Sequence, residues 1–111
     1  MSSEVTVILP NVDNDGRSLK VEQTSVLREL LTLAGGYTTS QVSGAWQDSD
    51  GTVYRNDSIQ ASTIVSDETV KVLLDTAVAW CARLRQLSLL VTVRSLDAYF
   101  IEQHISGQAA S

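Results

Sequence analysis

The first third of the chain joins a β-branched run to an amphipathic stretch. Residues 4–9 are rich in β-branched residues and end at Pro10, which has no N–H to donate to a sheet, so they predict a strand. Residues 11–16 collect Asn, Asp and Gly and predict a loop. Apolar residues then recur at three- and four-residue steps over residues 19–34, which predicts a helix that the glycines at 35–36 end. The expected apolar stripe of this helix is Val26, Leu27, Leu30, Leu31 and Ala34.

The middle of the chain predicts a hairpin. Residues 41–47 and 52–55 are extended in character and flank residues 48–51, which end in an Asp-Gly pair. Asp-Gly between two extended runs is a strong local signal for a hairpin turn. Residues 56–58 predict a bulge or bend, after which residues 59–65 are again rich in β-formers. We therefore expect one hairpin whose return strand is long and irregular.

A second amphipathic stretch predicts a helix that begins after Ser66 and ends near Gln86. Ser66 is a favourable N-cap, and Asp67 and Glu68 place negative charge where a helix dipole favours it. Trp80 is expected beside the apolar stripe, where it closes the edge of the stripe. The expected stripe consists of Val70, Leu73, Leu74, Ala77, Cys81 and Leu84.

The last quarter of the chain predicts two more strands. Residues 89–93 have the pattern of a buried strand, residues 95–97 of a turn, and residues 98–102 of a final strand. A continuous helix over residues 87–103 is the alternative, which the density of β-branched and aromatic residues disfavours. Residues 106–111 are expected to form a flexible tail.

The resulting element order predicts an α+β fold. One antiparallel sheet with both helices packed on one face buries both apolar stripes at once. This is the ferredoxin-like βαββαβ arrangement, here with an extra C-terminal edge strand. The length of 111 residues suits one domain, which we expect over residues 1–105.

Composition and charge narrow the classes of partner. The chain is 43% hydrophobic and 19% charged, which is typical of a globular protein. Its formal net charge of −5 disfavours direct binding to nucleic acid and favours a protein partner with a basic surface. The N-terminal residues lack a signal-peptide pattern, and no apolar run is long enough to span a membrane. Because Cys81 is the single cysteine, an internal disulfide is excluded, and we expect a cytoplasmic protein that does not bind membranes.

One motif suggests a cation site. Asn11, Asp13, Asp15 and Glu22 have the spacing of an EF-hand calcium loop. However, Asn11 stands where the motif expects aspartate, and a strand ending in Pro10 replaces the helix that precedes such a loop. We therefore favour a polar connection between strand and helix, with calcium-dependent folding through these residues as the weaker alternative.

Candidate catalytic groups are few. Nucleophilic catalysis requires a nucleophile and a base within hydrogen-bonding reach. Cys81 falls on the apolar stripe of its helix and is expected in the core, and His104, the single histidine, is expected to be a solvated side chain near the tail. The glycines at 35–36 follow a helix and are expected to cap it, not to bind phosphate. We therefore expect no catalytic residues, no cofactor and no enzymatic activity.

The hairpin carries the best candidates for a binding surface. Aromatic and arginine side chains dominate the energetics of protein interfaces. The candidate partner-binding residues are Tyr37, Trp46, Asp48, Asp50, Tyr54 and Arg55. The structural alternative is that Trp46 only covers the sheet.

Several short motifs resemble a family of small bacterial proteins that phages and plasmids often encode. The motifs are Gly-Gly-Tyr-Thr at 35–38, Gly-Ala-Trp at 44–46, Asp-Gly at 50–51 and Val-Tyr at 53–54. The opening residues 7–10 and 13–16 and the closing residues 99–102 are similar too. Those proteins tend to place an acidic residue after the position of Arg55, where this chain has Asn56 followed by Asp57. The resemblance implies an origin on a mobile element and no particular activity.

Two functional hypotheses follow. The first is a non-catalytic accessory protein of a phage, plasmid or other mobile element, for example an anti-defence inhibitor that docks on a host protein. The second is a small ligand-binding protein or enzyme built as a dimeric α+β barrel, in which Trp46, Tyr54 and Tyr99 line a cavity in a homodimer.

Overall fold

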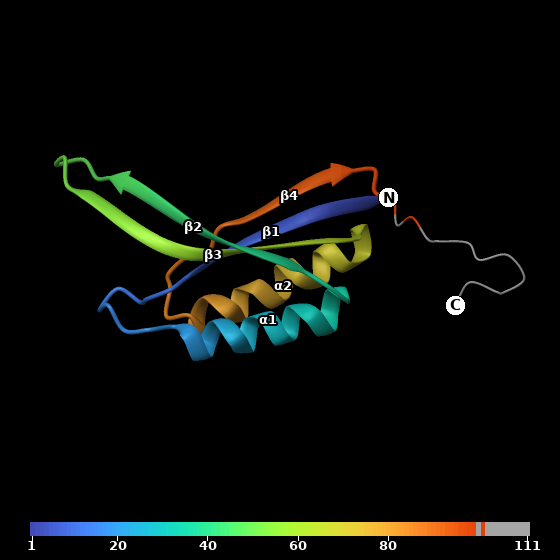
Figure 1. Cartoon of the computed structure of the whole chain (residues 1–111), viewed down its shortest axis with the longest axis horizontal. Helices are drawn as coiled ribbons and strands as arrows, with labels where there is room; N and C mark the ends of the chain where they lie inside the picture. The colour runs from blue at the N-terminus through green and yellow to red at the C-terminus, as the bar shows by residue number, and fades with distance from the viewer. Residues whose placement is uncertain (100, 102–111) are drawn as a thin grey trace, which may run out of the picture.

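A computed structural model describes residues 1–99 and 101 of the chain, and Figure 1 shows their arrangement. The elements in chain order are β1 (Ser2–Pro10), α1 (Lys20–Ala34), β2 (Thr38–Gln47), β3 (Val53–Ser66), α2 (Asp67–Arg83) and β4 (Val91–Leu96). The strand order in the sheet is β2-β3-β1-β4, and every neighbouring pair is antiparallel. Both helices lie on the same face of the sheet (Figure 1). The expected ferredoxin-like α+β arrangement is therefore confirmed.

The core lies between the sheet and the two helices. Every second residue of β1 is buried, from Ser3 to Leu9, because successive side chains of a strand point to opposite faces. The sequence predicted Trp80 at the edge of the apolar stripe of α2. In the structure Trp80 is instead completely buried in this core. Correspondingly, Leu74 is exposed and Cys81 is only half-buried. Turning the largest apolar side chain of α2 toward the sheet removes the most apolar surface from water.

The buried side of α1 also differs from the expected stripe. Leu31 is 48% exposed, whereas Gln23 is buried. The Nε2 atom of Gln23 donates to the carbonyl oxygens of Leu9 (3.2 Å) and Pro10 (2.8 Å) and to Oδ1 of Asn11 (2.9 Å). These acceptors satisfy the buried amide, so a polar residue replaces a leucine where α1 meets the end of β1.

The helix ends follow their sequence signals. Gly35 caps α1 in the left-handed region with a φ of 82°, which glycine adopts without steric cost. The Ser66 side chain accepts a hydrogen bond from the N–H of Thr69 at 3.3 Å and caps α2. α2 ends at Arg83, before the expected Gln86. Neither of these helices is long and apolar enough to cross a membrane, a result that applies to the described residues.

The hairpin is longer and more regular than expected. β2 and β3 pair continuously from Thr38↔Ser62 to Gln47↔Val53, so the bulge expected at residues 56–58 is absent. Asn56 and Asp57 are exposed, whereas Ser58 is buried, and all three keep their pairing with β2. The polar stretch therefore changes the surface of β3 and not its backbone.

The strand expected at residues 89–93 is shifted and exposed. β4 begins at Val91 and forms an edge of the sheet, with Leu90 63% and Val93 44% exposed. α2 packs mainly over β1 and β3. A buried strand was therefore the wrong prediction, because an edge strand beyond the helix is covered less than a central one.

The expected final strand at residues 98–102 is not formed where the structure describes it. Ala98, Tyr99 and Ile101 lie in no strand. Within the described residues the sheet therefore ends at β4. The other residues of that expected strand, His104 and the expected tail at residues 106–111 lie outside the described part of the chain.

Candidate binding site

The β2–β3 hairpin projects beyond the rest of the sheet (Figure 1). The last residue of β1, Pro10, pairs with Ser58 of β3. The next five pairs of the hairpin, from Ser43↔Asp57 to Gln47↔Val53, therefore have no third strand beside them. We call residues 43–57 the arm. All ten residues of these five pairs are exposed, so the arm is a two-stranded ribbon that neither helix covers.

The exposed ribbon carries a pair of stacked aromatic rings. Trp46 and Tyr54 are directly opposite each other across the two strands, with ring centroids 4.3 Å apart and an interplanar angle of 17°. Leu9 pairs with Ile59, so odd-numbered residues of β3 face the helices and Tyr54 faces the uncovered side. Trp46 is 53% and Tyr54 42% exposed. The rings stabilise the ribbon as a cross-strand pair and still present apolar surface to solvent.

The tip of the arm is an ordered, acidic turn. Oδ1 of Asp48 accepts from the backbone N–H groups of Asp50 and Thr52, both at 3.1 Å, and Oδ2 of Asp48 accepts from the Tyr54 hydroxyl at 3.2 Å. Hydrogen bonding with Asp48 and then with the hydroxyl and N–H of Thr52 lowers the pKa of Asp50 to about 2. Gly51 has a φ of 91°, which this turn requires and glycine supplies. The tip is therefore rigid, and Asp50 is anionic at neutral pH.

A cavity of about 710 Å³ lies beside the aromatic pair, and we call it the aromatic cavity. The end of β1, the arm and residues 86–90 line it. Trp46 and Tyr54 supply its aromatic surface, and Leu87 and Leu90 supply aliphatic surface. The cavity thus combines segments that are far apart in the sequence and meet at one end of the sheet.

The structure brings together most of the predicted partner-binding residues. The group at the arm is Trp46, Asp48, Asp50 and Tyr54. Arg55 follows Tyr54 in β3 and therefore points to the opposite face of the arm. Tyr37 precedes β2 at the end away from the tip, about 30 Å from Trp46 along an extended strand. Tyr37 and Arg55 are thus separate from the aromatic pair.

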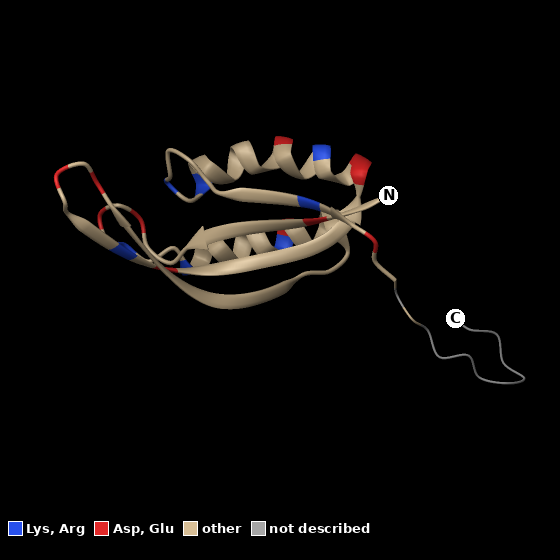
Figure 2. Cartoon of the chain, turned by 90° about the horizontal axis from the view of Figure 1, so that it is seen from above, with Lys and Arg blue, Asp and Glu red and all other residues tan. Residues whose placement is uncertain are grey.

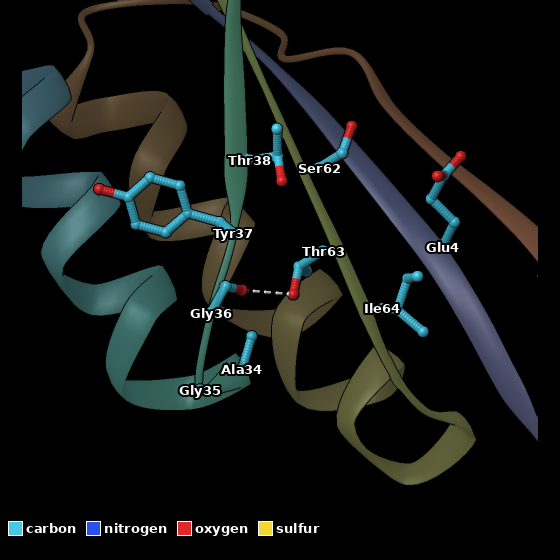
Figure 3. Close-up of a pocket in the computed structure, with 9 residues that line it drawn as sticks. All are labelled: Glu4, Ala34, Gly35, Gly36, Tyr37, Thr38, Ser62, Thr63 and Ile64. Atoms are coloured by element: carbon cyan, nitrogen blue, oxygen red, sulfur yellow. Dashed lines mark hydrogen bonds between the residues drawn. The ribbon is translucent and has the colours of Figure 1, made fainter. Parts of the chain in front are cut away.

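Tyr37 instead lines a second cavity, of about 590 Å³, shown in Figure 3. This cavity lies where the loop after α1 passes the edge of β3. The Thr63 hydroxyl donates to the carbonyl oxygen of Gly36 at 2.6 Å and holds the loop to the strand. The Tyr37 ring points away from Glu4, which lines the other side of the cavity (Figure 3). The glycines at 35–36 therefore cap α1 and shape this cavity.

The loop between β1 and α1 is organised around the buried carboxylate of Asp13. Its Oδ1 accepts from the backbone N–H groups of Asp15 and Arg17, both at 2.9 Å. Its Oδ2 accepts from Nε of Arg17 at 3.1 Å and from Nε of Arg85 at 2.8 Å. The N–H of Arg17, the guanidinium of Arg85 and the N–H of Asp15 lower the pKa of Asp13 to about 2, outweighing the opposite effect of burial. Both oxygens of Asp13 are thus occupied by protein donors.

The other residues of the calcium-like motif have protein partners as well. Oδ1 of Asn11 accepts from the Gln23 amide at 2.9 Å, and Glu22 lies 3.5 Å from the guanidinium of Arg85. Asp15 pairs with Arg17 at 3.1 Å, outside any shared centre. Among the residues that the structure describes, no group of three or more His, Cys, Asp or Glu side chains is placed to hold a metal ion. The loop instead joins β1, α1 and the end of α2 through ion pairs.

Arg85 reaches Asp13 from a strained backbone conformation. It has a φ of 52°, in the left-handed region that non-glycine residues enter at a cost of about 1–2 kcal/mol. Asp13 raises the pKa of Arg85, as expected for a guanidinium beside a carboxylate. The ion pair thus holds the chain in the turn that leads from α2 to residues 86–90.

Sequence reasoning missed the part of the aromatic cavity that residues 86–90 supply. Leu87 is completely exposed and Leu90 is 63% exposed. The sequence placed Leu90 in a buried strand, because a run of leucines beside β-branched residues has that pattern. Only the position of this segment beside the end of β1, where the N–H of Ile8 donates to the carbonyl oxygen of Leu90, identifies it as part of a surface.

Neither a family model nor a curated protein sequence matches the chain. The chain is similar in structure to the periplasmic divalent cation tolerance protein CutA from Archaeoglobus fulgidus, with a TM-score of 0.68, 11% identity and coverage of 90% of this chain and 88% of that one. It is also similar to a phage SAM lyase in complex with S-methyl-5'-thioadenosine, with a TM-score of 0.62, 12% identity and coverage of 84% and 80%. A Bacillus cereus protein related to NIF3 matches with a TM-score of 0.65 and 14% identity, over 87% of this chain and 26% of that one. At these identities the likeness shows the fold alone.

Proposed function

We propose that the protein is a non-catalytic binding protein that docks on a protein partner through its arm. The observation that carries this proposal is the stacked pair of Trp46 and Tyr54, exposed on a ribbon that no other element of the described chain covers. Aromatic side chains of this kind are concentrated at the centres of protein interfaces. Exposed apolar surface of this kind at the end of a projecting hairpin commonly marks a site of interaction with a partner.

The charge of the arm supports a partner with a basic surface. Figure 2 shows acidic positions at the tip, where Asp48 and Asp50 lie. Asp57 adds a third carboxylate at the base of the arm, where it accepts from the Ser43 hydroxyl at 2.6 Å. With a net charge of −5 for the whole chain, a complementary potential raises the rate of encounter.

Within this proposal, the protein is an accessory protein of a phage, plasmid or other mobile element, and the partner is a host protein that it inhibits. The family resemblance supports this origin, because its Gly-Ala-Trp motif at 44–46 and Val-Tyr motif at 53–54 are the two segments that supply the aromatic pair. An inhibitor of this kind needs a rigid docking surface and no reaction centre.

The proposal is tested by co-purification from a bacterial host lysate with matched variants. The double variant Trp46→Ser with Tyr54→Ser removes the aromatic pair at exposed positions. Leu31→Ser is the control, because Leu31 is similarly exposed but lies on α1, on the other side of the molecule. We expect a stoichiometric partner that the wild type and the control retain and the double variant loses, with unchanged circular dichroism. A wild type without a stoichiometric partner, or equal retention by all three proteins, contradicts the proposal.

A second candidate function is the binding of a small ligand in the aromatic cavity. Its volume of about 710 Å³ is in the range of small-molecule sites. The stacked rings offer a flat surface for another planar ring, and the phage SAM lyase of similar fold is described with S-methyl-5'-thioadenosine, which contains adenine. In the homodimeric α+β barrel form of this candidate, a second copy closes the cavity. Tyr99, which was expected to line it, is not among its lining residues.

This candidate is tested by titration with S-methyl-5'-thioadenosine. We expect saturable quenching of tryptophan fluorescence that disappears in Trp46→Phe, because Trp80 is buried in the core and away from the cavity lining. Calorimetry should show binding that Tyr54→Ala weakens. Absence of saturable heat at millimolar ligand eliminates this ligand, and with it the specific support for the candidate.

A further inference from the structure

The two outer strands of the sheet are unusually open to pairing. β2 pairs only with β3 and β4 only with β1 in the described part of the chain. Natural edge strands are normally protected by charges, prolines or bulges that block the addition of another strand. β2 has none of these over its ten residues. β4 has one charge, Arg94, which pairs with Glu4 of β1 at 3.1 Å. Both edges therefore present unprotected backbone groups.

The directions of these two edges are complementary. Because all three neighbouring pairs are antiparallel, β2 and β4 of one chain run in opposite directions. When β2 of a second copy is placed beside β4, the new pair is antiparallel too, and the alternation of the sheet continues. Such a contact joins two different edges, so each copy still offers one edge to the next. Head-to-tail contacts of this kind close into a ring where the rotation between copies returns to the first copy, and extend as a filament otherwise.

The same pairing brings two exposed apolar surfaces together. β4 starts at Val91, which pairs with Val7 near the end of β1, and the arm projects from this same end of the sheet (Figure 1). A β2 strand that is antiparallel to β4 therefore carries its arm past Val91 to residues 86–90. There the aromatic pair of one copy meets Leu87 and Leu90 of the next, which are 100% and 63% exposed. One contact thus covers the largest exposed apolar side chains of the arm and of residues 86–90.

Charge at this end of the molecule fits the same contact. The acidic tip of the arm, with Asp48 and Asp50, would approach the end of the next copy that carries Arg17 and Arg85. The guanidinium side chains of these two arginines are 67% and 39% exposed, although both pair with Asp13 of their own chain. Opposite charges at the rim favour this orientation over one that places two arm tips together.

We propose that β2 of one copy pairs antiparallel with β4 of the next, so that the arm covers Leu87 and Leu90 and the copies close into a ring. This rests on the proposed function, because it adds a second copy of this chain to the protein partners of the arm. Within one chain the arm and residues 86–90 already line the aromatic cavity. In the ring the arm of a neighbour also reaches residues 86–90, so assembly adds a second arm to this cavity.

The test blocks each edge separately. Ile8 donates to the carbonyl oxygen of Leu90, so alternate residues of β4 face β1 and Val93 directs its N–H to the open edge. Asp48 donates to the carbonyl oxygen of Thr52, so by the same alternation Gln41 directs its N–H to the open edge of β2. Val93→Pro and Gln41→Pro each remove one open N–H, whereas Val93→Ala and Gln41→Ala keep it.

We expect wild type and both alanine controls to assemble in sedimentation velocity, and each proline variant to raise the dissociation constant about tenfold or more. An equimolar mixture of Val93→Pro and Gln41→Pro then forms a 1:1 complex, because it contains one intact β2 edge and one intact β4 edge. Leu90→Asp serves as a second variant that leaves the backbone unchanged and is expected to weaken assembly as well. Circular dichroism melting confirms that each variant is folded.

A wild type that is monomeric at all concentrations overturns the inference, as does assembly that survives both proline variants and Leu90→Asp. Two monomeric proline variants whose mixture stays monomeric exclude the β2–β4 contact. If the chain is monomeric while the aromatic double variant still loses a host partner, the inference fails and the proposed function stands. If neither assembly nor any partner depends on the aromatic pair, both fail.

Discussion

The two halves of the hairpin share one register but differ in environment. In the inner half of β3, Ala61, Thr63 and Val65 are buried under the helices, whereas every residue over 53–57 is exposed. The backbone pairing is equally regular in both. The comparison shows that pairing alone continues a ribbon past the core, whereas burial depends on what the helices cover. The inner half therefore stabilises the fold, and the arm is available for binding.

The two tryptophans give the largest expected contrast between these regions. Trp80 is completely buried and Trp46 is 53% exposed. Trp80→Ala should lower the free energy of unfolding by about 3–5 kcal/mol, and Trp46→Ala by less than about 1 kcal/mol. Urea denaturation followed by circular dichroism measures both. Equal losses would mean that the arm belongs to the cooperative core.

Acid should weaken the tie between the β1–α1 loop and α2. Because the pKa of Asp13 is lowered from 3.8 to about 2, its contribution to stability is complete above pH 3.8 and is lost as the pH falls through 2. Asp13→Asn should make the free energy of unfolding less dependent on pH in this range. Asp15→Asn is the control, because Asp15 is exposed. A pH dependence that Asp13→Asn leaves unchanged contradicts the assignment.

Substitutions of Arg85, in the strained turn after α2, separate the effect of backbone strain on stability from the effect of the ion pair. Arg85→Ala and Arg85→Gly both remove the ion pair to Asp13, but only glycine is unstrained at a φ of 52°. The glycine variant should therefore be more stable than the alanine variant by about 1 kcal/mol, measured by thermal or urea denaturation. The reverse order would show that residue 85 changes its backbone conformation once the ion pair is lost.

The smallest expected effect is the coupling within the arm. A double-mutant cycle of Trp46→Ala and Tyr54→Ala should show an interaction of about 0.5–1 kcal/mol, because the rings stack across the two strands. A second double-mutant cycle, of Trp46→Ala and Arg55→Ala, should show no interaction, since Arg55 is on the opposite face of the arm. Coupling of Trp46 to Arg55 of similar size would contradict the orientation of the arm.

Much of the local structure was predictable because its signals are local. Ser66 and Gly35 cap the helices as expected, and the Asp50-Gly51 pair marks the turn of the hairpin. This turn places Trp46 opposite Tyr54, so the centre of the candidate site follows from the sequence as well. Its other wall does not, because Leu87 and Leu90 join it through the packing of α2 and β4 against β1.

The sequence by itself determined the order of strands and helices through β4, the caps at Gly35 and Ser66, and the aromatic pair on the arm. These depend on side-chain periodicity and turn chemistry, which act over a few neighbouring residues. Tertiary structure decided that Trp80 is central, that Gln23 is buried, that β4 is an exposed edge and that the arm extends past β1. Burial is set by which elements cover one another, and no local pattern of residues contains that information.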